Sequence, residues 1–218
     1  GVQGLADAYA MMDVAFYSEE AKEINSFIFE TMYHAALECS MEISKRDSPY
    51  STFEGSPASK GILQFDMWDV TPSNRYDWDS LKLNIKEHGI RNSLLLAPMP
   101  TASTSQILGN NECFEPFTSN IYVRRTIAGE FVCINKYLLK ELIDLDLWTD
   151  DIKNQIIRDN GSVQNIAKIP KGLKDKYKIV WEIPMKHILE MAADRGAFIC
   201  QSQSTNLWMK EPSYNKLT

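Results

Sequence analysis

Apolar residues recur at spacings of three and four along much of the chain, which places them on one face of a helix. This pattern predicts helices over residues 4–12, 18–44, 77–88, 101–108, 135–144, 149–159 and 171–193. Ser18, followed by Glu19 and Glu20, fits the start of the second helix, because a hydroxyl caps free amides and acidic residues suit the first turn. Pro184 is predicted to kink or restart the last helix.

Shorter apolar or alternating runs predict strands over residues 92–97, 121–125, 130–134 and 197–201. A turn at Ala128-Gly129 would join the middle two, and Gly89 and Gly109 fit helix C-caps. The proline- and glycine-containing stretch 47–74 is predicted to be irregular. Residues 211–218 fit the beginning of a helix. With no internal repeat or linker, the pattern indicates one α/β unit over 1–218, truncated at both ends.

Composition narrows the class of protein further. The 218 residues are 44% hydrophobic and 24% charged, as in folded proteins. A net charge of -6 disfavours nucleic acid and anionic membrane as partners, because both are bound by clustered cations. No apolar run approaches the roughly 20 residues that span a bilayer. We therefore expect a cytoplasmic protein without membrane or nucleic-acid contacts.

The cysteines are scattered and have no partner histidines at ligand spacing. They are expected to be reduced thiols, and no metal site is predicted. The residues concerned are Cys39, Cys113, Cys133 and Cys200.

One stretch, residues 92–109, carries recognisable chemistry because it passes from apolar strand through a proline-bounded turn into a helix start. With Thr101 as N-cap, the amides of Ala102, Ser103 and Thr104 would lack an intrahelical acceptor. The hydroxyls of Thr101, Ser103 and Thr104 would add donors. Together with the helix dipole, such donors can bind a phosphate or diphosphate without Lys or Arg.

The alternative is a purely structural role, in which Thr101 and Ser103 only cap a short helix. The stretch also differs from a glycine-rich P-loop, because no glycine precedes the helix and no Lys-Ser/Thr pair follows it. The spacing alone leaves both interpretations open.

Other polar residues have simpler structural explanations. The histidines are expected to be core or surface residues, and the carboxylates around 54–69 to form turns and caps. The lysines between 168 and 178 are expected to form a solvated helix face. Arg124 and Arg125 are neighbours on a predicted strand, and neighbours on a strand point to opposite faces, so the two side chains cannot both bind one anion. The residues in question are His34, His88, His187, Glu54, Asp66, Asp69, Lys168, Lys171, Lys174, Lys176, Lys178, Arg124 and Arg125.

Several ordered segments resemble the large, catalytic subunit of class I ribonucleoside-diphosphate reductases of the eukaryotic-like branch. The likeness extends over nearly the whole chain. It is carried by Gly1–Ala8, Tyr50–Pro57, Ser59–Trp68, Gly89–Ser93, Ala97–Thr104, Gly109–Glu112, Asn154–Ile157, Asp194–Ile199 and Gln201–Ser204.

The resemblance implies roughly the C-terminal half of a ten-stranded α/β barrel, in an allosteric, ATP-binding enzyme that makes deoxyribonucleotides for DNA replication. In that family the Pro-Thr-Ala-Ser-Thr turn binds the substrate diphosphate. This role falls here on Pro100, Thr101, Ala102, Ser103 and Thr104. The family role thus coincides with the turn that the local pattern singles out.

The resemblance also implies what the segment lacks. The family's radical cysteine on its Asn-x-Cys-x-Glu loop, its tyrosine pair and its C-terminal redox cysteines match nothing here, so no catalytic residue is expected and the chain alone should be inactive. No cofactor is expected on this segment. The full enzyme would depend on a radical from a metal-containing small subunit and on a dithiol reductant such as thioredoxin or glutaredoxin.

The implied partners are a ribonucleoside diphosphate, the rest of the large-subunit chain, a second large subunit and the small radical-generating subunit. A non-catalytic phosphate-binding or scaffolding module of the same fold is the alternative function.

Overall fold

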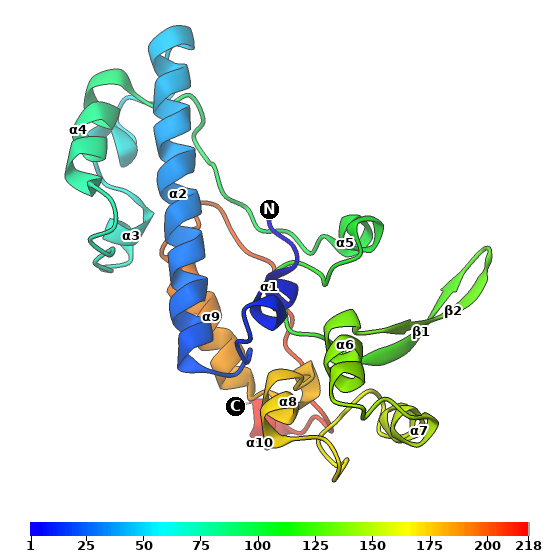
Figure 1. The fold of residues 1–218 in the computed structure, drawn as a ribbon. Coiled ribbons are helices and arrows are strands. Elements are labelled where there is room, and N and C mark those ends of the chain that lie inside the picture. The colour runs from blue at the N-terminus through cyan, green and yellow to red at the C-terminus, as the bar shows by residue number, and fades with distance from the viewer. Residues whose placement is uncertain (218) are drawn as a thin grey trace. The chain divides into compact units, whose positions relative to one another are not determined.

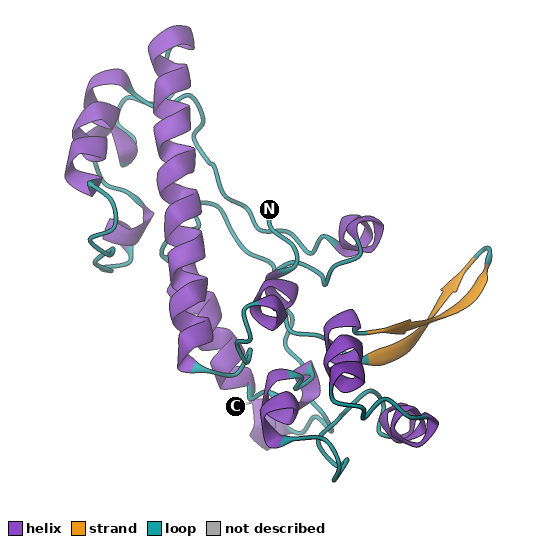
Figure 2. Ribbon diagram, viewed as in Figure 1, coloured by secondary structure: helices purple, strands orange, loops and turns teal. Residues whose placement is uncertain are grey.

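A computed structural model describes residues 1–217, with side chains through Asn215. It contains helices, one pair of strands and long irregular connections (Figure 2). The chain divides into two compact units. The first comprises Gly1, Lys22–Met99 and Glu190–Thr205, and the second Val2–Ala21, Pro100–Leu189 and Asn206–Thr218.

Helices dominate the first unit. The long helix α2 runs beside α4 and α3 (Figure 1). The elements are α2 (Glu19–Asp47, from Lys22 on), η1 (Ala58–Lys60), α3 (Gln64–Met67), α4 (Trp78–His88) and the later part of α9 (Met185–Gly196).

Aromatic side chains pack α2 against α3 and α4. Phe65 is 1% exposed, and its ring lies edge-on to Trp78 with a centroid distance of 4.8 Å. Tyr33 of α2 contacts both rings. At the far end of α4, the Ser44 hydroxyl donates to the carbonyl of His88 at 2.7 Å. Burial of such large rings contributes strongly to apolar packing.

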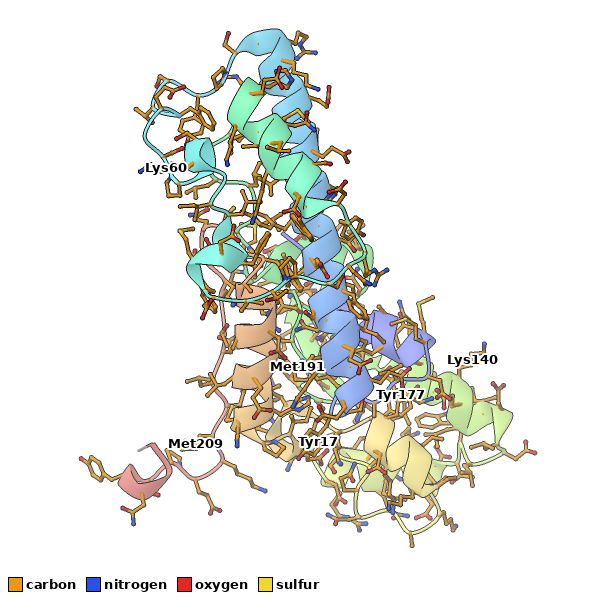
Figure 3. The ribbon with its side chains drawn as sticks, turned by 90° about the vertical axis from the view of Figure 1, so that its left-hand side faces the viewer. Tyr17, Lys60, Lys140, Tyr177, Met191 and Met209 are labelled. Carbon is orange, nitrogen blue, oxygen red and sulfur yellow. The ribbon has the colours of Figure 1, made fainter. Side chains whose placement is uncertain are left out.

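Helix α9 is held to α2 by polar contacts. Lys22 pairs with Glu190 at 2.7 Å, and the Asn25 side-chain amide donates to the carbonyl of Met191 at 2.9 Å. Met191, labelled in Figure 3, is itself 1% exposed. The Arg195 guanidinium is 2% exposed and donates to Asn25 and Gln203, so this buried charge lies among amide acceptors.

The second unit combines short helices with an antiparallel hairpin. Its elements are α1 (Leu5–Met11), α5 (Ala102–Leu108), β1 (Ile121–Thr126), β2 (Gly129–Ile134), α6 (Lys136–Asp144), α7 (Asp150–Arg158), α8 (Lys171–Lys176), η2 (Val180–Glu182) and α10 (Tyr214–Leu217).

The hairpin register pairs Ile121 with Ile134 and Thr126 with Gly129. Behind its base, apolar side chains from α6, α7 and the following loops form one core. Its members are Ile121, Leu138, Leu142, Ile152, Ile156, Val163, Ile166, Ile169 and Tyr177.

Most predicted helices are confirmed, and so is the cap predicted at Ser18. Ser18 accepts from the amide of Ala21 at 3.1 Å. Asn135 and Thr149 accept from the first-turn amides of α6 and α7. The hairpin strands lie where alternation predicted them. The expected helix over 211–218 is seen as α10, and Thr218 lies outside the described residues.

Four predictions about elements are corrected. Residues 92–97 and 197–201 form no strand, and residues 197 and 198 are a turn after α9. The stretch 47–74 is not wholly irregular, since it contains η1 and α3. The single helix expected over 171–193 is three separate pieces, with Pro184 directly before α9, where a restart had been predicted.

Candidate functional site

The turn formed by residues 100–104 leads directly into α5. Helix α5 begins at Ala102, so Thr101 occupies the position predicted for the N-cap. Among the hydrogen bonds of the described residues, none uses the amides of Ala102, Ser103 or Thr104 as donor. The three residues are also exposed. Free amides at a helix start can bind an anion from solvent.

Thr101 does not act as the conventional cap that the sequence suggested. Its backbone is left-handed, with φ 54° and ψ 26°, and its side chain accepts no bond from α5. Thr101 Oγ1 instead accepts from the amide of Cys113 at 2.8 Å. The interpretation that this hydroxyl merely caps the helix is therefore wrong.

The other hydroxyls of the turn differ in their availability. Thr104 Oγ1 donates to the carbonyl of Thr101 at 3.3 Å, so that hydroxyl is engaged locally. No hydrogen bond of the described residues involves the Ser103 hydroxyl. The expected set of three hydroxyl donors is thus reduced, and the main-chain amides are the principal donors of the turn.

Local hydrogen bonds define both ends of helix α5. Ser105 is fully buried, and its amide donates to the carbonyl of Thr101 at 3.0 Å. At the other end, Gly109 is left-handed with φ 70°, and the amide of Asn110 donates back to the carbonyl of Ser105 at 3.1 Å. The predicted C-cap at Gly109 is confirmed, and α5 is limited to two turns.

A cavity of about 650 Å³ lies in the same unit, and the turn does not line it. Its wall includes acidic, basic and aromatic side chains, among them Asp7, Glu115, Arg124, Lys136, Tyr137 and Trp208. Two buried polar atoms in the wall, Asn110 Oδ1 and Trp208 Nε1, have no hydrogen-bond partner. Residues 100–104 therefore face solvent and not this cavity.

The cysteines are all free thiols. Burial and the neighbouring Glu115 carboxylate raise the pKa of the Cys113 thiol to about 11, so Cys113 is a protonated, unreactive thiol at neutral pH. Cys200 Sγ accepts from the amides of Leu95 and Leu96 at 3.0 and 3.2 Å. The Cys200 sulfur is therefore hydrogen-bonded within the fold, and Cys113 is 2% exposed.

The histidines have structural environments, as expected. His34 stacks on Tyr76 with a centroid distance of 4.3 Å. The buried ring of His187 lies 3.0 Å from the carbonyl of Phe16. His88 ends α4, with Glu87 Oε2 3.9 Å from its Nε2.

Three of the remaining charged candidates have local partners. Asp66 Oδ2 accepts from the amide of Leu63 at 2.7 Å, which confirms the expected capping role. Arg125 pairs across the hairpin with Glu130 at 2.7 Å, whereas Arg124 donates to the hydroxyl of Tyr122 at 3.2 Å. The two arginines therefore do not converge.

Lys176 departs from the expected solvated face. Its side chain is 9% exposed and binds Asp13 and Glu141.

Within residues 1–217 no helix is long and apolar enough to cross a membrane. The same residues contain no cluster of three or more His, Cys, Asp or Glu arranged to hold a metal ion.

Sequence reasoning missed the support of the turn. Cys113 was considered only as a thiol, but it acts through its main-chain amide. Asp7, which is 7% exposed, accepts from the amide of Asn111 at 2.7 Å. No local motif marks either residue, because both contacts join segments far apart in the sequence.

Comparison with known proteins agrees with the resemblance seen in the sequence. The family model described as "Ribonucleotide reductase, barrel domain" matches residues 1–218. The large chain of ribonucleoside-diphosphate reductase from Neurospora crassa is 60% identical over 218 residues, which are 100% of this chain and 24% of that protein. The Caenorhabditis elegans large subunit is 59% identical over 218 residues, 100% of this chain and 28% of that protein.

A solved structure supports the same fold. The class Id ribonucleotide reductase alpha subunit of Actinobacillus ureae matches with a TM-score of 0.69 and 28% identity, over 93% of this chain and 31% of that one. The chain spans about a quarter of the length of the curated relatives named above. The expected fold class, part of a reductase barrel of mixed helices and strands, is confirmed. The chain belongs to the family of ribonucleotide reductase large subunits and corresponds to part of their barrel domain.

Proposed function

We propose that this chain supplies the diphosphate-binding turn of a ribonucleoside-diphosphate reductase. The full enzyme would reduce ribonucleoside diphosphates to deoxyribonucleoside diphosphates. The observation that supports this role is the set of three exposed amides, from Ala102, Ser103 and Thr104, that no other described group engages.

The turn would bind the substrate through its backbone. The diphosphate oxygens would accept from the three amides, and the Ser103 hydroxyl would add a fourth donor. Pro100 restricts the chain entering the turn, since its ring fixes φ. Charge-assisted hydrogen bonds to an anion are stronger than neutral ones, so such a turn can hold a diphosphate on a chain whose net charge is -6.

The turn contributes orientation and not electron transfer. None of its residues is redox-active, and Cys113, the nearest thiol in sequence, has a pKa of about 11 and remains protonated. A radical from a metal-containing small subunit and a dithiol reductant would drive the reduction. The rest of the large-subunit chain would supply the catalytic cysteines, and a second large subunit would complete the allosteric enzyme.

Substitution of Ser103 tests the proposed turn. In a full-length large subunit carrying this segment, Ser103→Pro removes one amide donor and one hydroxyl, and it disfavours the helical conformation of Ala102. We expect the dissociation constant of CDP, measured by calorimetry, to rise at least about tenfold, or about 1.4 kcal/mol. An unchanged dissociation constant would show that the diphosphate binds elsewhere.

Two further variants separate the contributions of the turn. Ser103→Ala keeps the amide and loses only the hydroxyl, so a smaller rise of about threefold is expected. Ile107→Ala alters a side chain that is 81% exposed on the same helix and should leave the dissociation constant unchanged. Equal effects of Ser103→Ala and Ser103→Pro would contradict an amide-based site, because only the proline variant removes an amide donor.

A further inference from the structure

Two left-handed residues support the turn, and neither is glycine. Thr101 has φ 54° and Cys113 has φ 36°. This conformation is unfavourable for residues with a Cβ, so both need external constraint. One hydrogen bond joins them directly, from the amide of Cys113 to Thr101 Oγ1 at 2.8 Å.

The segment that contains Cys113 is fixed in turn by the start of α1. The amide of Gly4 donates to the carbonyl of Asn111 at 3.0 Å, and the amide of Leu5 donates to the carbonyl of Cys113 at 3.3 Å. The amide of Asn111 donates to Asp7 Oδ2 at 2.7 Å. The segment is thus held on both sides of Glu112.

Among the hydrogen bonds that hold residues 111–113, the one to Asp7 has a carboxylate as its acceptor. The Asp7 side chain is 7% exposed, and a carboxylate accepting from an amide forms a stronger bond than a neutral acceptor does. Burial keeps water from replacing Asp7 as the partner of Asn111. Asp7 has no described hydrogen bond to residues 100–104, and its bond to Asn111 connects it to them through residues 111–113.

We propose that Asp7 is a positioning residue for the diphosphate turn, acting through the Asn111 and Cys113 amides to hold Thr101 in its left-handed conformation. The proposal rests on the function proposed above for residues 100–104. Thr101 immediately precedes the three free amides, so its backbone angles determine where those amides point. Without the support, Thr101 would relax toward ordinary angles and the three amides would change direction.

The test is made in the full-length large subunit, with CDP as the probe. Asp7→Ala removes the acceptor of the Asn111 amide. We expect the dissociation constant of CDP to rise about tenfold, while kcat at saturating CDP stays within about twofold. Asp7→Asn retains an oxygen at the same place and should restore most of the affinity.

Two further variants serve as the control and as a fallback. Ile107→Ala is the matched control on α5. If Asp7→Ala does not fold, Asp7→Glu displaces the carboxylate by one methylene and should raise the dissociation constant about threefold.

The outcomes separate this proposal from the function on which it rests. If Ser103→Pro has no effect on CDP binding, the diphosphate site itself is wrong. If Ser103→Pro weakens binding but Asp7→Ala and Asp7→Glu leave the dissociation constant within twofold, only the positioning role of Asp7 is overturned. A fall in kcat with unchanged affinity would also overturn it, because misaligned binding donors act on affinity.

Discussion

The side-chain amide of Asn135 donates to the side-chain oxygen of Asn120 at 3.0 Å, and both residues are buried at the base of the hairpin. Asn120 also donates to the carbonyls of Gly161 and Tyr177, at 3.0 and 2.9 Å. Asn135 uses its own oxygen to cap α6. This pair therefore connects the hairpin, the start of α6 and the loops after α7 and α8.

Loss of the Asn120 side chain should be strongly destabilising. Asn120→Ala leaves the Tyr177 carbonyl and the Asn135 side-chain amide buried without these partners, and each such group costs about 1–3 kcal/mol. The Gly161 carbonyl loses one of its two bonds and keeps the one from the main-chain amide of residue 120. We expect the free energy of unfolding to fall by about 3 kcal/mol. Urea unfolding of the chain, followed by circular dichroism, measures this change.

Asn154 provides the control for that experiment. It is exposed on α7 and forms no described hydrogen bond, so Asn154→Ala should be neutral or slightly stabilising through helix propensity. Equal effects of the two substitutions would mean that the Asn120 contacts contribute nothing specific.

A second prediction concerns alkaline pH. Burial and the Glu141 carboxylate raise the pKa of Tyr177 above its ordinary value of 10.0, and Tyr177 (Figure 3) donates to Glu141 Oε1 at 2.5 Å. Burial lowers the pKa of Lys176, but hydrogen bonds to Asp13 and Glu141 raise it more. Both groups therefore hold their protons more tightly in the folded chain than in the unfolded chain.

The sign of the effect follows from proton binding. Above pH 10 the unfolded chain loses the Tyr177 proton while the folded chain retains it, so the free energy of unfolding falls as pH rises. Below that pH the contribution is fully present. We expect urea midpoints to be constant between about pH 7 and 9 and to decrease steadily above about pH 10.

Tyr177→Phe isolates the contribution of this hydroxyl. The variant should lose stability at pH 8, because a buried hydrogen bond is removed, but its stability should decline less steeply above pH 10. Tyr214→Phe, at a side chain that is 89% exposed, should leave the slope unchanged. Parallel pH profiles for Tyr177→Phe and the parent chain would contradict the assignment.

The sequence was sufficient for elements whose signals are local. Ser18, Asn135 and Thr149 lie where their side-chain oxygens meet first-turn amides, and these contacts span only two or three residues. The hairpin was predictable because alternation and a short turn specify antiparallel pairing. The end of α5 at Gly109 was also predicted from a local signal, the glycine itself.

The two strands that were wrongly predicted depended on distant partners. An apolar run shows that residues are buried, but a strand also requires a ladder of hydrogen bonds. The amide of Gln201 donates to the carbonyl of Leu96 at 3.1 Å, and the amide of Ser204 to the carbonyl of Pro98 at 3.0 Å. The two segments therefore lie alongside each other without forming a regular ladder.

At the candidate site, too, the features with local signals were predicted and those that depend on distant contacts were not. The helix start at Ala102 and its free amides were predicted from residues 92–109 alone. The left-handed conformation of Thr101 and its bond to Cys113 did not, because nothing in the residue type of either predicts a positive φ. Asp7 lies 104 positions from its partner Asn111, beyond the reach of any local pattern.

The last prediction compares two glycines with opposite requirements. Gly161 has φ 86°, and a Cβ there would lie 1.8 Å from Ser119 Oγ and 2.9 Å from the amide nitrogen of Asn120. Gly161→Ala should therefore cost more than about 2 kcal/mol, through both backbone strain and displacement of the Asn120 contacts. Gly172 lies in α8 with open space around its Cβ position, so Gly172→Ala should stabilise the chain by about 0.5–1 kcal/mol. Thermal melting of both variants checks the pair. A neutral Gly161→Ala would show that the backbone accepts a side chain at this positive φ, and a destabilised Gly172→Ala would show that a Cβ at position 172 is not accommodated in the open space around it.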